Sequence, residues 1–321
     1  MIMEMKGVKV LVRTCGDVKP GEKVLVVADS ENEGIAGLVS GMCVAFGAET
    51  VVVTMAPRKN HGEEPPCAVA AAMMESDIIF AVTTFSLFHS SARIRACKNG
   101  ARWINMAGYT MEMLRAGGLM ADFGKQRILS EKLADKLSEG MKVMVTTEKG
   151  TKIGFSIVNR KAIAEGGISD RAGMVNSPPD VETCIAPVEG TANGVIVLDG
   201  SIVQPGLGPL DEDVVVEVRD GNVIDIRGGK EAEILSNMLE AAGDPGVYNI
   251  GEFGVGLNPE CRLCGSMLED EGVYGTAHFG IGDNHTMGGT VEAAMHTDAI
   301  FWKPTIVVDD KTVMKSGELL I

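Results

Sequence analysis

Two short apolar runs with a helical segment between them, all within residues 22–55, decide the fold. The runs "EKVLVVAD" (22–29) and "ETVVVTM" (49–55) are rich in β-branched residues, which favour strands. Between them, "EGIAGLVSGMCVAFGA" (33–48) carries its apolar residues at the spacing of one helix face. A strand, a helix and a second strand in this order predict a right-handed βαβ unit on a parallel sheet.

The same alternation continues as far as residue 106. Segments with a helical pattern, 67–77 and 90–101, alternate with the strand-like runs 78–85 and 102–106. We therefore expect an α/β domain with a parallel sheet at the start of the chain. No Gly-x-Gly-x-x-Gly follows the first expected strand, so a dinucleotide site is not predicted.

The pattern changes near residue 140. An amphipathic helix is expected over 123–140, where Gly140 ends the periodic run. Beyond it, alternating runs in 142–158 and 214–229 contain Lys-Gly and Asp-Gly pairs, which are typical of antiparallel hairpins. We predict an α/β domain over residues 1–140 and a β-rich α+β domain over residues 141–321.

Composition excludes several classes of partner. The net charge of −15 leaves no basic stripe for a nucleic-acid backbone. No apolar run approaches the roughly 20 residues that a membrane helix needs, and Glu4 stands where a signal peptide would be basic. Seven scattered cysteines, an odd number, suit a reducing compartment. We expect a cytoplasmic protein with no membrane and no nucleic-acid partner.

Histidines are rare in this chain and gather in one late region. Of five in all, His278, His285 and His296 fall within twenty residues of one another. His296 and Asp298, two apart in an extended segment, project to the same face. An imidazole beside a carboxylate is half of a divalent-metal site. A buried histidine hydrogen-bonded to a neighbouring acid is the other explanation for such a pair.

Further ionisable residues occur in apolar, glycine-flanked settings. His278 lies in "YGTAHFGIGDN" (274–284), Glu252 in "YNIGEFGVGLNP" (248–259), and Glu182 and Glu189 beside prolines in "PPDVETCIAPVEG" (178–190). A carboxylate in such a setting is costly unless something compensates its charge. Sharing metal ions offsets this cost, and these ligands are enough for two adjacent divalent ions.

The last seventy residues, together with "APVEGTANGVIVLDGSI" (186–202), resemble the thermophilic metalloprotease family of aminopeptidases T and S. The resemblance implies two metal ions held by Glu182, Glu252, His278, His296 and Asp298. A mixed nitrogen and oxygen ligand set accepts Zn, Co, Mn or Fe. The catalytic tyrosine of that family corresponds to His285 here. His285 is then a candidate donor to a developing oxyanion, or else an exposed turn residue.

More distantly, the chain is similar to 2,5-dihydroxypyridine 5,6-dioxygenase, an iron enzyme that opens a pyridine ring. In "TFSLFHSSARIRACKNGARW" (84–103), His89 matches a histidine proposed there as a base, although a helix-start hydrogen bond also explains it. The two-histidine, one-carboxylate iron site of that enzyme would place its last two ligands at His296 and Asp298. Its other histidine falls at Glu252, and it has no histidine at the position of His278.

The ligand set favours the peptidase, so the expected activity is that of a metallo-aminopeptidase-like hydrolase. Water activated at the two-metal site would attack an amide or peptide bond, and Glu182 or Glu189, whichever is not a ligand, would take its proton. The alternatives are a mononuclear Fe(II) ring-cleaving dioxygenase and a non-catalytic descendant that keeps the metals for stability. We further expect a homodimer acting on a small molecule or short peptide.

Overall fold

The computed structural model describes residues 2–204 and 206–321, and the chain divides into two compact units. Unit 1 consists of Met1–Gly124 and Gly167–Pro179, and unit 2 of Lys125–Gly166 and Asp180–Ile321. No helix in the described part of the chain is long and apolar enough to cross a membrane.

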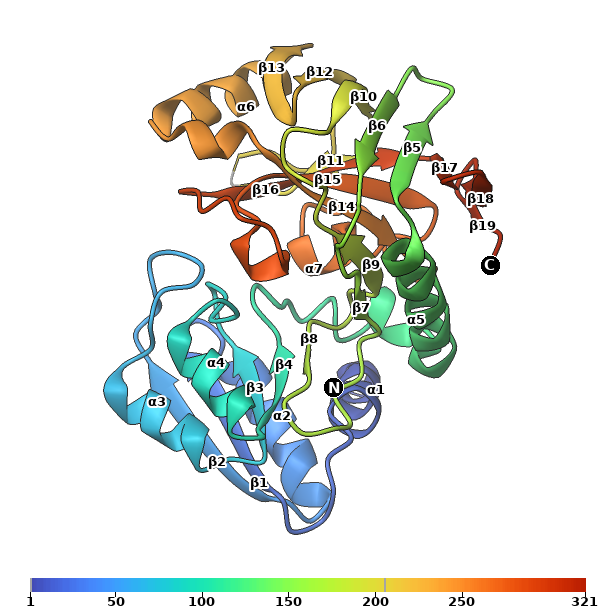
Figure 1. Cartoon of the computed structure of the whole chain (residues 1–321). Coiled ribbons are helices and arrows are strands. Elements are labelled where there is room, and N and C mark those ends of the chain that lie inside the picture. The colour runs from blue at the N-terminus through green and yellow to red at the C-terminus, as the bar shows by residue number, and fades with distance from the viewer. Residues whose placement is uncertain (1, 205) are drawn as a thin grey trace. The chain divides into compact units, whose positions relative to one another are not determined.

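Unit 1 is built on a five-stranded, wholly parallel sheet of order β2-β1-β3-β4-β8 (Figure 1). This confirms the α/β domain with a parallel sheet. The strands are β1 (Lys23–Asp29), β2 (Glu49–Met55), β3 (Ile78–Val82), β4 (Arg102–Asn105) and β8 (Val175–Asn176). The α-helices are α1 (Ile2–Val10), α2 (Glu33–Ala45), α3 (Cys67–Met74) and α4 (Ser91–Lys98).

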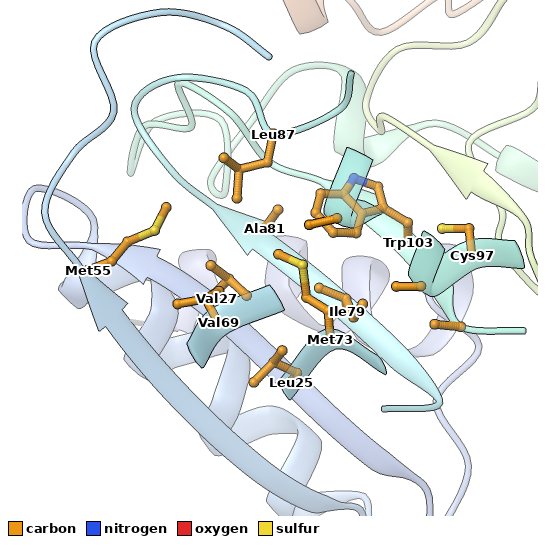
Figure 2. Close-up of a cluster of buried hydrophobic side chains, with 13 residues drawn as sticks. Leu25, Val27, Met55, Val69, Met73, Ile79, Ala81, Leu87, Cys97 and Trp103 are labelled. Carbon is orange, nitrogen blue, oxygen red and sulfur yellow. The ribbon is translucent and has the colours of Figure 1, made fainter. Parts of the chain in front are cut away.

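The alternation of each strand places one set of side chains in a core beside this sheet. Leu25 and Val27 of β1, Ile79 of β3 and Trp103 of β4 are each at most 1% exposed. Figure 2 shows them gathered with Met73 of α3 in one apolar cluster. Burial on both faces explains why these strands read as continuous apolar runs in the sequence.

Unit 2 contains two antiparallel sheets, as expected for a β-rich domain. The eight-stranded sheet has the order β13-β12-β10-β6-β5-β17-β18-β19. Its strands are β5 (Lys142–Thr146), β6 (Lys152–Ser156), β10 (Asn193–Leu198), β12 (Val214–Arg219), β13 (Asn222–Arg227), β17 (Thr305–Val308), β18 (Lys311–Lys315) and β19 (Glu318–Leu319). The turn joining β12 to β13 has positive φ at both Asp220 and Gly221, as an Asp-Gly hairpin requires.

The six-stranded sheet has the order β11-β16-β15-β14-β9-β7. Its strands are β7 (Ile163–Glu165), β9 (Glu182–Ile185), β11 (Ser201–Ile202), β14 (Ile250–Gly256), β15 (Thr276–Gly282) and β16 (His296–Trp302). The α-helices of this unit are α5 (Phe123–Glu139), α6 (Lys230–Ala241) and α7 (Met267–Asp270).

The bounds of the units differ from the expected break after residue 140. All but the first two residues of α5 belong to unit 2, where the Ser130 hydroxyl donates a hydrogen bond to the Glu182 carbonyl (2.7 Å). The segment 167–179 returns to unit 1 because β8 pairs with β4. Two long-range contacts therefore set bounds that local periodicity does not show.

One face of the six-stranded sheet is apolar and packs toward the eight-stranded sheet. Phe253 of β14, Phe279 of β15 and Phe301 of β16 line up across it, with ring centroids 5.2 and 5.8 Å apart. Phe155 of β6 lies 5.2 Å from Phe253 and 5.8 Å from Phe279. Because successive side chains of a strand alternate in direction, the neighbours of these phenylalanines point to the opposite face.

Candidate metal centre

The opposite face of the six-stranded sheet carries the residues that the sequence singled out as metal ligands. Strands β9, β14, β15 and β16 lie side by side in this sheet (Figure 1). Glu252 precedes Phe253, His278 precedes Phe279, and Asp298 lies three residues before Phe301. All three therefore point away from the phenylalanine face. Glu182 and His296 complete the set on the outer two of these strands.

Glycines stand beside these side chains on the neighbouring strands. Gly254 is paired with His278, and Gly280 with both Glu252 and Asp298. A Cβ at Gly254 would lie 2.0 Å from His278 Nε2, and one at Gly280 would lie 2.5 Å from the His296 ring. The glycines that flank the ionisable residues in the sequence thus leave room for these side chains to lie across the sheet.

Three potential metal ligands, His296 among them, lie close together. Its Nε2 lies 3.0 Å from Glu252 Oε2 and 3.1 Å from Asp298 Oδ1. One ligand atom from each of these residues lies within 4.8 Å of the others. One nitrogen and two oxygens at this separation form an arrangement that a single divalent ion could bridge.

A second histidine lies on the other side of Glu252. His278 Nε2 is 3.8 Å from Glu252 Oε1 and 3.1 Å from Glu182 Oε2. The contact with Glu182 lacks hydrogen-bond geometry, so His278 Nε2 and Glu182 Oε2 are both buried without a hydrogen-bond partner in the described part of the chain. Buried polar atoms left in this way are available to a cation.

The buried charges perturb one another strongly. Burial lowers the pKa of both His278 and His296, but the neighbouring carboxylates outweigh it and raise both well above the ordinary value. Burial raises the pKa of Glu252, yet the two histidines outweigh it, and the net shift is downward. For Glu182, burial prevails over His278 and raises the pKa. The site is therefore a compact group of interacting charges within an apolar domain.

The ring of His296 is fixed from behind. Its Nδ1 lies 2.7 Å from the carbonyl oxygen of Asp283, which can only accept a hydrogen bond. Nδ1 therefore carries a proton, and Nε2 faces the carboxylates. A second hydrogen bond of this kind orients a metal-binding histidine and raises its basicity.

Glu189, expected as a candidate base, is held in a network of donors. Its Oε1 accepts hydrogen bonds from Asn284 Nδ2 (3.1 Å) and the Thr290 amide (2.8 Å), and its Oε2 pairs with Arg160. Burial raises its pKa, but these hydrogen bonds and the Arg160 charge prevail and lower it. A carboxylate with a lowered pKa is a weak base. Glu189 instead connects the loop that contains Asp283 and His285 to Arg160.

The other two expected catalytic residues lie on turns. His285 is half-exposed at the start of a single 3-10 turn (His285–Met287), with Nδ1 2.8 Å from the Asp283 carboxylate. His89 is exposed and belongs to unit 1, where it packs edge-on against Phe88 just before α4. The structure thus places His285 on the same loop as Asp283, whose carbonyl orients His296.

Two acidic residues near the site were missed from the sequence. Asp180 and Glu271 each offer an oxygen within 4.8 Å of Glu182 and of each other. Burial and neighbouring carboxylates raise the pKa of both well above the ordinary value. Asp180, two residues before Glu182, shares the spacing of His296 and Asp298. Nothing local marks Glu271, which lies within the acidic run "EDEG".

Comparison with known proteins decides the family. The family model described as 2,5-dihydroxypyridine 5,6-dioxygenase matches residues 8–321. This chain belongs to the 2,5-dihydroxypyridine 5,6-dioxygenase family. A curated member from Pseudomonas putida is 28% identical over 263 residues, which cover 79% of this chain and 73% of that protein.

Solved structures agree on the fold of this dioxygenase family member. The structure of the Pseudomonas putida 2,5-dihydroxypyridine dioxygenase has a TM-score of 0.84 at 22% identity, covering 99% of this chain and 96% of that one. AmpT from Thermus thermophilus has a TM-score of 0.70 at 16% identity, covering 100% and 99%. The resemblance to aminopeptidase T is thus a shared fold.

The prediction of a metallo-aminopeptidase-like hydrolase is wrong. The family match and the curated relative support the alternative, a dioxygenase, and contradict the designations hydrolase, metalloprotease and aminopeptidase. Five ligand positions match the peptidase family, but the similarity of the whole chain is to the dioxygenase. Histidine and carboxylate ligands on one fold can serve different chemistries.

Proposed function

We propose that this protein is an iron-dependent dioxygenase that opens a dihydroxylated aromatic ring of the 2,5-dihydroxypyridine type. The observation that carries the proposal is the convergence of Glu252, His296 and Asp298 on one sheet face, in a chain of the dioxygenase family. We assign these three residues as the ligands of one iron ion.

The donors fit such an ion in number, and they depart from the commonest set in one ligand type. Non-haem Fe(II) oxygenases commonly use two histidines and one carboxylate, whereas here the convergent group has one histidine and two carboxylates. Mixed nitrogen and oxygen ligands accept Fe(II), and the unpartnered buried atoms of His278 and Glu182 lie beside Glu252. When bound, iron with open coordination positions supplies the redox chemistry toward dioxygen.

The residues around the site position the ligands and move protons. The Asp283 carbonyl holds the His296 ring, and the Asp283 carboxylate orients the His285 ring. A histidine oriented by a carboxylate is suited to accept a proton from a substrate hydroxyl. We propose His285 for this role. His89 is the alternative base, which the family resemblance implies. Glu189 is proposed to hold the loop that carries His285.

The expectation of two ions remains a prediction. Its support is that the two oxygens of Glu252 face different histidines, Oε2 toward His296 (3.0 Å) and Oε1 toward His278 (3.8 Å). A second ion bridged by Glu252 would take His278 and Glu182 as its further ligands. Substitution of His278 by alanine would remove that ion and leave the ion on His296.

The test is an assay of purified protein reconstituted anaerobically with Fe(II) and then supplied with 2,5-dihydroxypyridine and dioxygen. We expect oxygen uptake that depends on iron and on substrate, and loss of this uptake in His296→Ala and Asp298→Ala. Iron-loaded protein that consumes no oxygen with this or related hydroxypyridines would refute the proposal.

A further inference from the structure

A second group of buried carboxylates lies on the side of Glu182 that the iron proposal does not use. Asp180, Glu182 and Glu271 are 3%, 5% and 9% exposed. Each offers an oxygen atom within 4.8 Å of the others. Three carboxylates buried this close together repel one another unless cations or protons lie between them.

Hydrogen bonds do not satisfy this group. Asp180 Oδ1, Glu182 Oε2 and Glu271 Oε1 are each buried without a hydrogen-bond partner among the described residues. Burying a carboxylate oxygen without a hydrogen-bond donor costs desolvation free energy, and packing alone does not offset this cost. All three residues leave one oxygen in this state.

A histidine supplies independent evidence for a ligand here. His278 is 1% exposed, and its Nε2 points at Glu182 Oε2 from 3.1 Å. Both of its ring nitrogens lack a hydrogen-bond partner in the described chain. A fully buried imidazole almost always has such a partner, because its two nitrogens are strong polar groups. An imidazole that lies within ion-pair range of Glu182, with no hydrogen bond to either ring nitrogen among the described residues, marks this side of the sheet as a place for a cation.

The backbone leaves space for the carboxylate of Asp180. A Cβ at Gly272 would lie 2.8 Å from Asp180 Oδ1 and 3.1 Å from the Val181 amide nitrogen. Gly272 follows Glu271 directly, so a single close approach of two segments brings Asp180 and Glu271 together. Any larger residue at Gly272 would push the Asp180 carboxylate out of the group.

We propose that Asp180, Glu182 and Glu271 bind a hard divalent cation, such as Mg²⁺ or Mn²⁺, at a site separate from the iron on Glu252, His296 and Asp298. Oxygen-only ligand sets favour Mg²⁺, Ca²⁺ and Mn²⁺ over softer metals. The site takes Glu182 and leaves Glu252 out, so it is an alternative to a second ion bridged by Glu252 and not an addition to it. Its occupant fixes Glu182, and through Glu182 the ring of His278.

The proposal is tested by titrating Mn²⁺ into the full chain after removal of metals by a chelator, with binding followed calorimetrically. Wild type is expected to bind two Mn²⁺ per chain. Asp180→Asn and Glu271→Gln are each expected to lose the ion at the carboxylate group and keep the ion at His296. His296→Ala is expected to lose the ion at His296 and keep the other. Glu260→Gln, an exposed substitution of the same kind, should bind as wild type does.

Gly272→Ala keeps all three carboxylates and displaces Asp180. It should therefore weaken binding of the ion at the carboxylate group at least tenfold, even where an acidic-residue variant fails to fold.

Binding of two ions by both Asp180→Asn and Glu271→Gln would overturn the proposal, as would binding of only one by wild type. If the second ion disappears in His278→Ala and survives in Glu271→Gln, it is the bridged ion, and the carboxylate site is refuted. A rise in the thermal midpoint of Glu271→Gln with unchanged Mn²⁺ binding would show that protons occupy the group instead. None of these outcomes bears on the proposed dioxygenase activity, which the iron-dependent oxygen assay tests separately.

Discussion

His296 lies between two carboxylates, with its Nε2 3.0 Å from Glu252 and 3.1 Å from Asp298, while its Nδ1 donates to the carbonyl of Asp283. The two ring nitrogens thus make different contacts. Nδ1 fixes the orientation of the ring, and Nε2 is directed toward the expected ion. The other histidine in unit 2 with buried carboxylate neighbours, His278, has no hydrogen bond to its Nδ1 from any described residue.

Removal of either end of the His296–Asp298 pair should abolish iron binding. His296→Ala and Asp298→Ala each delete one of three convergent donors, so we expect less than a tenth of the wild-type iron after desalting, measured by elemental analysis. His61→Ala is the matched control, because His61 lies in unit 1 and accepts a hydrogen bond from the Ser86 amide (3.2 Å). Wild-type iron content in both site variants would contradict the assignment.

At the scale of elements, the site depends on a sheet with two different faces. Phenylalanines on β14, β15 and β16 pack on one face, and charged ligands paired with glycines occupy the other. The loop between β15 and β16 supplies the second hydrogen bond to His296 and carries His285. The Glu189–Arg160 pair holds this loop in place, since Asn284 of the loop donates a hydrogen bond to Glu189.

A methyl group at Gly254 should disturb the site from inside the sheet. The new Cβ would meet His278 Nε2 at 2.0 Å, so Gly254→Ala forces that ring to move. We expect a loss of about 1–3 kcal/mol in the free energy of unfolding, as for other overpacked cores. Urea denaturation measures it. Gly37→Ala, in an exposed part of α2 with no atom near the added Cβ, should be neutral or stabilising. Equal stabilities would argue against the close approach.

Loosening of the β15–β16 loop should weaken metal binding without removing a ligand. Arg160→Ala and Glu189→Gln each remove the Arg160–Glu189 ion pair that supports the loop, and the Asp283 carbonyl is held less firmly behind His296. We expect iron affinity to fall roughly 10- to 100-fold, the usual effect of losing a group that orients a metal ligand. The measurement is a competition titration with a chelator of known affinity. A fall in thermal stability with unchanged affinity would limit these residues to a structural role.

The sequence indicated much of this site because its signals are local. The two-residue spacing of His296 and Asp298, and the glycines around Glu252 and His278, follow from strand geometry alone. Asp180 with Glu271 and Glu189 with Arg160 are far apart in the chain, and only the folded sheets bring them together. The two-residue strand β8 is too short to show a period, so the return of the chain to unit 1 could not be foreseen.

At the scale of the whole molecule, the chain combines an α/β unit with a unit of two antiparallel sheets, and the fold is shared with both a dioxygenase and AmpT. The fold therefore does not determine the reaction. Ligand types alone favoured the hydrolase, whereas similarity over nearly the full length identified the dioxygenase family. Assembly as a homodimer remains a prediction, which light scattering of the purified protein would check.

We propose that this chain uses iron and dioxygen to open a dihydroxylated ring. The most direct measurement follows oxygen with an electrode while Fe(II)-loaded protein converts 2,5-dihydroxypyridine, and compares oxygen consumed with substrate lost. We predict that one dioxygen is consumed per substrate molecule, with no conversion in the absence of oxygen and none in Asp298→Ala. Turnover that continues under strict anaerobiosis, or substrate loss without oxygen uptake, would contradict it.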